Sequence, residues 1–322
     1  MLDARTYAIG LRTRFRGLDV RHGMLLEGPA GWAEFAPFDD YDIAACVPWW
    51  QAAVEAATVG WPAPVRDRIP VNVTIPACAP DRAAAIIAAH PGAHTAKVKV
   101  AEAGQTLGED LERVAAVRDA LGTAGWIRVD ANGGWPDPEV AAAAIVALHR
   151  EVGLQYVEQP CATVEELARV RRLVDVPIAA DESIRRAADP LRVAREHAAD
   201  IAVIKVAPLG GVAAALRLIE QIGLPVVVSS ALETSVGIAA GVALAAALPE
   251  LPYACGLATV ALLDRDVCAE PLLAVDGYLP VRRAVPDPAA LAALAAPHDV
   301  SVMWEQRLSA VRAAAAACGS TR

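Results

Sequence analysis

Between residues 69 and 259, short runs rich in β-branched residues alternate with longer Ala-, Leu-, Arg- and Glu-rich stretches of helical periodicity. This pattern is typical of repeated βα units, in which helices cover a parallel sheet. The runs predict eight strands at a spacing of roughly 20 to 30 residues, which matches a compact (β/α) barrel of the TIM type. The predicted strands are residues 69–77, 95–100, 126–132, 154–160, 177–182, 200–206, 225–230 and 253–259.

A doubly wound open sheet is the competing fold for this pattern. That fold usually carries a glycine-rich phosphate-binding turn after its first strand. The sequence IPACAPDR, at the end of the first predicted strand, contains no glycine. The barrel is therefore the favoured fold.

The composition limits the partners that we expect. The chain has 322 residues, of which 55% are hydrophobic, and is long enough for one large domain and a smaller one. Its net charge is -9 and no run of Lys or Arg forms a basic stripe, so we expect no nucleic-acid partner. The most apolar segment, residues 236–248, is too short to span a membrane and predicts a buried helix. No protein partner is indicated.

The first residues and the cysteine pattern favour a cytoplasmic location. The opening sequence MLDARTYAIGLRTRFRG lacks the apolar run that a secretory signal requires. The cysteines form no CxxC pair, and none lies at metal-ligand spacing from a histidine. We therefore expect small reduced thiols, as in the cytosol. The six cysteines are Cys46, Cys78, Cys161, Cys255, Cys268 and Cys318.

Three carboxylates, Asp130, Glu158 and Asp181, stand at the ends of three successive predicted strands. The carboxyl ends of parallel barrel strands meet at one rim, where barrel enzymes carry their chemistry. Taken singly, each residue is as well explained as a cap of the following helix. Together, three neighbouring carboxylates repel one another unless a cation lies between them. Oxygen ligands without His or Cys favour Mg²⁺, with Mn²⁺ as a substitute.

Lysine is rare in this chain. Of the 29 Lys and Arg residues, only Lys97, Lys99 and Lys205 are lysines, and all three lie near predicted strand ends with inward side chains. A lysine at a strand end can simply extend its amine to solvent. That alternative is plausible for one such lysine but poor for all three. Lysine can lose a proton at accessible pH and arginine cannot. This usage therefore predicts acid/base chemistry, with repulsion from Lys97 and the metal favouring the neutral amine of Lys99.

These motifs resemble those of the enolase superfamily, in its muconate-lactonising-enzyme-like subgroup: the lysines in KVK and IKV, and the carboxylates in DAN, EQP and ADES. Within it, the segments LRTRFRG, GWAEFAPF and SSALETSVG are most similar to the o-succinylbenzoate synthase family of actinobacterial type. The resemblance covers nearly the whole chain. It implies a barrel with an α+β capping domain, built from residues 1–68 and completed by the tail 270–322, around a catalytic domain of residues 69–269.

The resemblance also implies a reaction: the Mg²⁺-dependent dehydration of 2-succinyl-6-hydroxy-2,4-cyclohexadiene-1-carboxylate to 2-succinylbenzoate, a step of menaquinone biosynthesis. It implies that Lys99 transfers the α-proton. Lys205, on the other face, is then either a second acid/base or a cation that stabilises the enediolate. Supporting or substrate-binding roles, with helix caps and turn serines as the alternatives, are predicted for Lys97, Asn132, Glu182, Ser229 and Ser230.

Three other functions remain open on the sequence. An N-succinylamino acid racemase or dipeptide epimerase of the same superfamily would exchange an α-proton between the same two lysines. A Schiff-base aldolase would form an imine at Lys205. A non-catalytic barrel would keep the fold and bind metal without catalysing a reaction, although the intact carboxylates and lysines argue against it. Arg12, Arg14 and Arg16 are interpreted as solvated surface residues outside the site.

Overall fold

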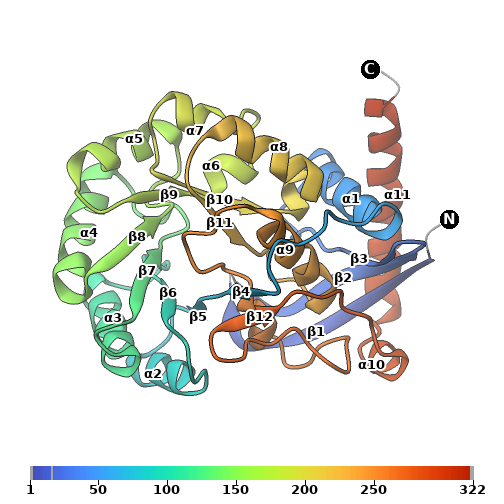
Figure 1. Ribbon diagram of the computed structural model, residues 1–322, viewed down its shortest axis with the longest axis horizontal. Coiled ribbons are helices and arrows are strands. Elements are labelled where there is room, and N and C mark those ends of the chain that lie inside the picture. Colours follow the sequence, from blue (N-terminus) through green and yellow to red (C-terminus); the bar gives the residue numbers. More distant parts are fainter. Residues whose placement is uncertain (1–2, 16, 320–322) are drawn as a thin grey trace.

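The computed structural model describes residues 3–15 and 17–319. A curled sheet surrounded by helices lies beside a small antiparallel sheet with helices of its own, at the right of Figure 1. In the small sheet the strand order is β1-β2-β3, and α1 packs between β3 and α11. The last helix therefore returns to the first strands. The elements of this region are β1 (Asp3–Phe15), β2 (Leu18–Gly28), β3 (Gly31–Phe35), α1 (Ile43–Thr58), α10 (Pro288–Ala293) and α11 (His298–Gly319).

Local sequence signals explain α1. The Asp42 carboxylate accepts a hydrogen bond from the amide of Ala45 at 2.7 Å and caps the helix start. Its apolar face contributes Trp49 to the core, and the ring of Trp304 on α11 meets Phe35 on β3 edge to face at 6.1 Å. Aromatic packing thus joins the two ends of the chain.

The second sheet has seven parallel strands in the order β11-β10-β9-β8-β7-β6-β5. Helices cover its outer face (Figure 1). The barrel strands are β5 (Val73–Ile75), β6 (Thr95–Lys99), β7 (Trp126–Asp130), β8 (Leu154–Glu158), β9 (Ile178–Ala180), β10 (Ile201–Lys205) and β11 (Val226–Ser229). The helices between and after them are α2 (Pro80–Ala88), α3 (Leu107–Leu121), α4 (Pro138–Val152), α5 (Val164–Leu173), α6 (Glu182–Arg185), α7 (Arg192–Arg195), η1 (Ala207–Leu209), α8 (Val212–Ile222), α9 (Ser235–Ala247) and η2 (Ala258–Leu262).

The prediction of an eighth strand over residues 253–259 is wrong. Only isolated bridges form there, from Val71 to Cys255 and from Ser229 to Gly256, and η2 begins at Ala258. Backbone hydrogen bonds still link the two edges of the sheet through this segment: Cys255 bonds to residues 70 and 72, and the Gly256 amide bonds to Val228. The segment therefore closes the barrel without adding a full strand.

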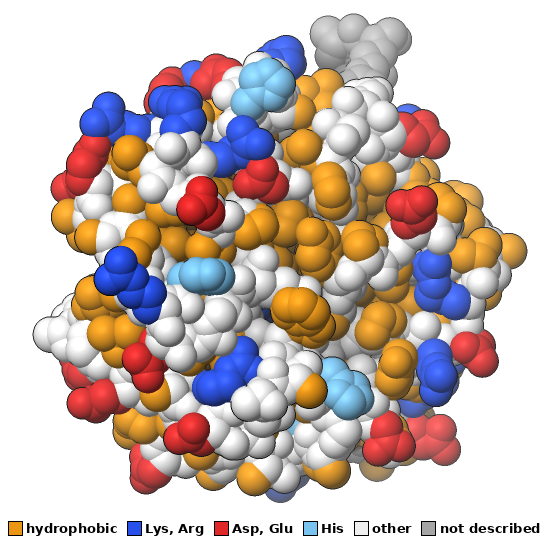
Figure 2. Space-filling view, turned by 60° about the vertical axis from the view of Figure 1, so that its left-hand side comes forward, with side chains coloured by type: hydrophobic (Ala, Val, Ile, Leu, Met, Phe, Trp, Pro, Cys, Tyr) orange, Lys and Arg blue, Asp and Glu red, His pale blue; other side chains and the backbone are white. Residues whose placement is uncertain are grey.

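The first predicted strand, residues 69–77, is confirmed only in part. Its second half, β5, joins the barrel sheet, whereas β4 (Arg68–Pro70) pairs with β12 (Tyr278–Pro280) of the tail in a separate two-stranded sheet. The apolar segment 236–248 forms most of α9, a buried helix. No helix in the described part of the chain is long and apolar enough to cross a membrane. On the face in Figure 2, basic and acidic side chains are interspersed among hydrophobic ones.

Candidate active site

The register of the barrel strands brings the predicted carboxylates together at one rim. Asp130 ends β7 and pairs in register with Glu158, which ends β8, while Asp181 follows β9 directly. All three side chains are at most 1% exposed. Parallel strands end at the same edge of a sheet, so neighbouring strands hold these carboxylates close to one another.

The three lysines lie among these carboxylates. Lys97 Nζ donates to Asp130 Oδ2 at 2.9 Å and to Glu158 Oε1 at 2.8 Å. Lys99 Nζ also donates to Asp130. On the other side of the rim, Lys205 Nζ donates to Asp181 Oδ2 at 2.6 Å. Buried opposite charges thus compensate one another.

Burial and neighbouring charge set the protonation of the rim. Burial together with repulsion from Asp130 raises the pKa of Glu158 to about 7. Burial opposes the charged forms of Asp130 and Lys97, but their mutual attraction dominates, so the pKa of Asp130 is lowered and that of Lys97 is raised. Burial lowers the pKa of Lys205. The carboxylates therefore require nearby positive charge.

The donor set fits a hard divalent cation by its chemistry, because it consists of carboxylate oxygens at adjacent strand ends. As the side chains stand, however, no group of three His, Cys, Asp or Glu within residues 3–15 and 17–319 is arranged to hold a metal ion. The ammonium group of Lys97 lies between Asp130 and Glu158 instead. Metal binding would require this ammonium group to move aside.

A pocket opens above the rim. Its inner part, a cavity of about 30 Å³, is bounded by Lys97, Lys99, Asp130 and Lys205. An outer part of about 370 Å³ shares Lys99 with it and opens past the hairpin between β1 and β2. The inner cavity is further lined by Phe15, Phe38, Thr74, Asn132, Ser229, Ser230, Ala231, Leu232, Gly256 and Thr259.

Two predicted supporting residues lie beside the rim. Asn132 accepts a hydrogen bond from Lys99 Nζ at 2.6 Å, and its own amide group donates to Glu182 at 3.2 Å. Glu182 also pairs with Arg185. Asn132 has a φ of 48°, a left-handed conformation that asparagine tolerates better than most residues. Both side chains thus belong to the polar network around Lys99.

The predicted serines lie on the opposite wall of the pocket. Ser230 Oγ donates to the carbonyl of Gly256 at 2.7 Å. Ser229, which pairs in register with Lys205, lies 3.5 Å from the same carbonyl through its Oγ. Both residues therefore connect the pocket to the segment that closes the barrel.

Two polar residues at the rim were not predicted. Arg185, the last residue of α6, donates to Asp181, the residue before that helix, at 2.9 Å. The side-chain oxygen of Gln159 accepts hydrogen bonds from the amides of Asp181 at 3.0 Å and Ser183 at 3.1 Å. Both contacts fix Asp181. The motifs EQP and ADESIR contain these residues, and the spacing of four residues between Asp181 and Arg185 was an available signal.

The first-strand arginines differ in position. Arg12 donates to the carbonyl of Leu263 at 2.9 Å, away from the rim. Arg14 is largely exposed but lines the outer part of the pocket. Arg16 lies outside the described residues. Among the described residues, Arg14 is the arginine that lines the outer pocket.

Fold and rim together define a class: (β/α) barrel enzymes of the enolase type. The chain matches the family models "Enolase C-terminal domain-like" over residues 81–289 and "Enolase N-terminal domain-like" over residues 6–57. It is 61% identical to o-succinylbenzoate synthase of Thermobifida fusca over 313 residues, covering 97% of each chain. It is 57% identical to the synthase of Mycolicibacterium smegmatis, covering 95% of this chain and 94% of that one. The chain belongs to the o-succinylbenzoate synthase family of the enolase superfamily, whose enzymes use a divalent metal ion.

Solved structures support the fold. A muconate lactonizing enzyme from Pseudomonas fluorescens superposes with a TM-score of 0.76 at 23% identity, over 92% of this chain and 98% of that chain. The L-Ala-D/L-Glu epimerase from Bacillus subtilis gives a TM-score of 0.75 at 23% identity, over 89% and 96% of the two chains. One architecture thus carries more than one named activity, and fold alone does not select the reaction.

Proposed function

We propose that this chain is a metal-dependent hydro-lyase that converts 2-succinyl-6-hydroxy-2,4-cyclohexadiene-1-carboxylate to 2-succinylbenzoate, a step of menaquinone biosynthesis. The observation that carries the proposal is the 57–61% identity to synthases along nearly the whole chain. The buried rim supports it, because removal of a proton next to a carboxylate requires a base and positive charge at the carboxylate.

We assign Asp130, Glu158 and Asp181 as ligands of Mg²⁺, with Mn²⁺ as a substitute. When bound, the ion supplies positive charge to the substrate carboxylate. Gln159 and Arg185 then hold Asp181, the ligand that they already contact. Lys97 withdraws from between two of the ligands and remains close enough to contact the substrate carboxylate.

We assign the proton transfer to Lys99. Its Nζ takes the α-proton, and the electron pair of that C–H bond passes into the carboxylate group. The electron pair then returns to form the C=C bond between the α-carbon and the carbon that bears the hydroxyl, and the C–O bond of that hydroxyl breaks. Lys99 returns the proton to the departing hydroxyl, so that water and the aromatic ring result. Asn132 orients the Lys99 amine through their hydrogen bond. Lys205 approaches from the Asp181 side, as a second acid/base or as a fixed positive charge.

The remaining assignments concern substrate binding and location. We propose that Ser229 and Ser230 contact the succinyl part of the substrate from the opposite wall, and that Glu182 holds Asn132. The cysteines with described side chains are free thiols, which supports a cytoplasmic location. We retain residues 1–68, 69–269 and 270–322 as the proposed domain bounds.

The test is incubation of the protein with Mg²⁺ and the cyclohexadiene substrate while absorbance of the aromatic product is recorded. We expect the signal to grow, to vanish with EDTA and to return with added Mg²⁺. A folded, metal-bound protein without signal would contradict the synthase assignment. Deuterium uptake at the α-carbon of an N-succinylamino acid or dipeptide, without dehydration, would favour a racemase or epimerase. Activity resistant to EDTA, with borohydride trapping at Lys205, would indicate an aldolase.

A further inference from the structure

Two charged residues of the N-terminal sheet are buried against the barrel. Arg21 on β2 is 2% exposed and Glu34 on β3 is 8% exposed. Both contact residues 230–237, which run from the end of β11 into the first turn of α9. Neither belongs to the rim described above, and neither was singled out from the sequence.

Glu34 binds the start of α9. Its carboxylate accepts hydrogen bonds from the amide of Thr234 at 3.1 Å, from the hydroxyl of Thr234, and from the amide of Gly237 at 3.0 Å. A helix start has free amides and a partial positive charge, so a carboxylate binds well there. On the domain side, Tyr7 Oη donates to Glu34 at 2.6 Å. Glu34 thus ties β1 and β3 to the barrel helix.

Arg21 binds the residues just before that helix. Its guanidinium donates to the carbonyls of Leu232 at 3.0 Å and Ala231 at 3.4 Å, and also to the carbonyl of Ala36. It lies 4.5 Å from the ring centre of Phe38. Leu232 has a φ of 62°, which is costly for a residue with a side chain and persists only where the surroundings impose it. Arg21 binds at that residue.

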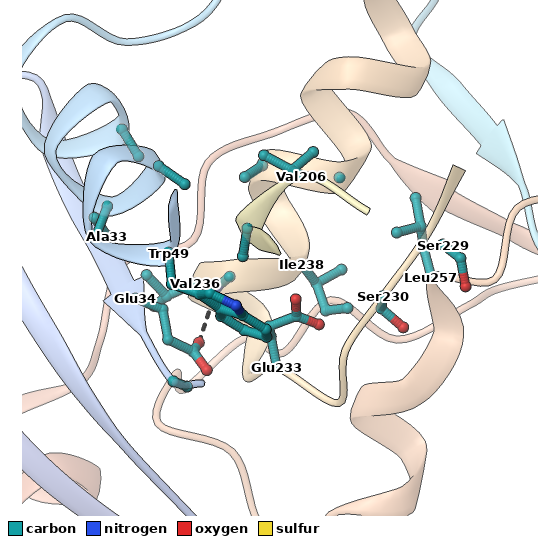
Figure 3. A pocket seen from close by; sticks show the side chains of 18 residues that line it. Ala33, Glu34, Trp49, Val206, Ser229, Ser230, Glu233, Val236, Ile238 and Leu257 are labelled. Carbon is teal, nitrogen blue, oxygen red and sulfur yellow. Dashed lines mark hydrogen bonds between the residues drawn. The ribbon is translucent and has the colours of Figure 1, made fainter. Parts of the chain in front are cut away.

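The segment that these residues hold is a wall of the active-site pocket. Ser230, Ala231 and Leu232 line the inner cavity with Lys205, and Phe38, which packs on Arg21, lines it too. Behind this wall lies a second cavity, shown in Figure 3, where Glu34 lies on one side and Ser230 on the other. The contacts that Arg21 and Glu34 make from the N-terminal sheet therefore act on the active-site pocket through the short segment that forms this wall.

A purely structural role does not account for this choice of residues. The hydrogen-bond partners of Glu34 are the neutral groups of Tyr7, Thr234 and Gly237. Burying a carboxylate is costly, and an apolar side chain would join the two surfaces at lower cost. What the charged groups add is directional contact with particular backbone atoms.

We propose that Arg21 and Glu34 are positioning residues for the dehydration reaction: from the N-terminal domain they fix residues 230–237 in the conformation that forms the substrate-facing wall. The proposal rests on the proposed function of this site. The lysines of the rim are on other strands, so the wall affects substrate binding more than proton transfer.

The experiment compares Glu34→Gln and Arg21→Lys with Arg66→Lys. Arg66 donates to the carbonyls of Ala245 at 2.5 Å and Leu248 at 2.7 Å, at the opposite end of α9. It therefore binds the same helix through side-chain hydrogen bonds to backbone carbonyls, but it does not contact the pocket wall. If Arg21→Lys does not fold, Thr234→Val replaces it. This change keeps the backbone and removes the hydroxyl that donates to Glu34 and accepts from the amide of Val236.

For each variant we would measure kcat and KM with Mg²⁺ at pH 8, and hydrogen exchange of the amides in residues 229–237 by mass spectrometry. We expect KM to rise about 10-fold in Glu34→Gln and Arg21→Lys, with kcat within about 3-fold, and exchange in the segment to become faster. Arg66→Lys should leave KM and this exchange unchanged, even where it lowers the melting temperature.

Unchanged exchange in both N-terminal variants would overturn the proposal, as would faster exchange with an unchanged KM. If KM rose as much in Arg66→Lys as in the other variants, the rise would be explained by a general loss of stability. That result would also overturn the proposal. Wild-type protein without turnover would instead defeat the proposed function. Faster exchange in the N-terminal variants but not in Arg66→Lys would then still support the physical contact.

Discussion

The buried charges inside the barrel and those at the contact between the two domains are compensated in different ways. At the rim, buried side chains form ion pairs with one another, and Lys97 lies between Asp130 and Glu158. At the domain contact, Arg21 and Glu34 form hydrogen bonds with backbone carbonyls and amides of one segment. Groups that pair with each other can exchange partners for a substrate or ion, whereas groups that bind backbone fix its conformation. The first region is suited to chemistry and the second to position.

The largest expected effect lies at the rim. Lys99→Arg keeps the positive charge but removes the ability to give up a proton, so we expect kcat to fall by about 10²- to 10⁴-fold. The rate of product absorbance measures it. Lys205→Arg serves as the comparison, because a role as a fixed charge predicts a much smaller loss. A Lys99→Arg enzyme with more than a tenth of the wild-type kcat would contradict the assignment of proton transfer to Lys99, and with it the view that the rim is the region suited to chemistry.

A second test concerns the exchange of partners at the rim. We expect Glu158→Gln to weaken Mg²⁺ binding by about 100-fold, because a neutral amide oxygen replaces a charged ligand. Isothermal titration calorimetry with Mg²⁺ alone gives the affinity without reference to turnover. Glu233→Gln is the matched control, since Glu233 is also buried but binds the amide of Ala231. Equal Mg²⁺ affinities in wild type and Glu158→Gln would exclude Glu158 as a metal ligand.

The domain contact has its own pH dependence. Burial raises the pKa of Glu34 to about 7, above the ordinary value of 4.5, so the folded protein holds this proton more tightly than the unfolded chain. The Glu34 contribution to stability is therefore complete below pH 4.5 and is lost as the pH rises through 7, by on the order of 3 kcal/mol. The charged or titratable groups that face it are Tyr7, Arg21, Glu233 and Cys268.

Urea unfolding of wild type and Glu34→Gln from pH 5 to pH 8 measures this contribution. We expect the free energy of unfolding of wild type, minus that of the variant, to decrease as the pH rises, because the variant has no proton to lose there. A difference that is constant over this range would show that Glu34 does not titrate in it.

The smallest effect is expected on the wall itself. Ser230→Ala removes the hydrogen bond to the carbonyl of Gly256 and the one shared with the hydroxyl of Thr259, so we expect a loss of about 1 to 2 kcal/mol in stability and a two- to threefold rise in KM. Ser301→Ala, which removes a hydroxyl from α11 far along the chain, is the control and should leave KM unchanged. An unchanged KM in Ser230→Ala would show that only the backbone of this wall acts on the substrate.

Sequence reasoning predicted position well where position follows from strand period and strand end. Asp130, Glu158 and Lys205 end their strands as predicted, because a side chain at the end of a parallel strand has only two faces to choose between. The prediction of the eighth strand was wrong because YACGLAT forms only isolated bridges, and two of its first four residues, Ala254 and Gly256, have low strand propensity. Arg21 and Leu232 are 211 residues apart, and no local pattern predicts such a contact.

The reduced eighth strand leaves one side of this barrel held by isolated bridges instead of a continuous ladder. Residues 253–259 contribute bridges and a 3₁₀ turn, yet Gly256 and Thr259 line the inner cavity. Substitution of Thr259 changes the size and polarity of the cavity without breaking a row of strand pairs, whereas a side chain at Gly256 would meet Ser229 Oγ at 2.5 Å. We therefore expect a change of substrate preference to arise more readily at Thr259 than at Gly256, while the rim on β6 to β10 keeps its chemistry.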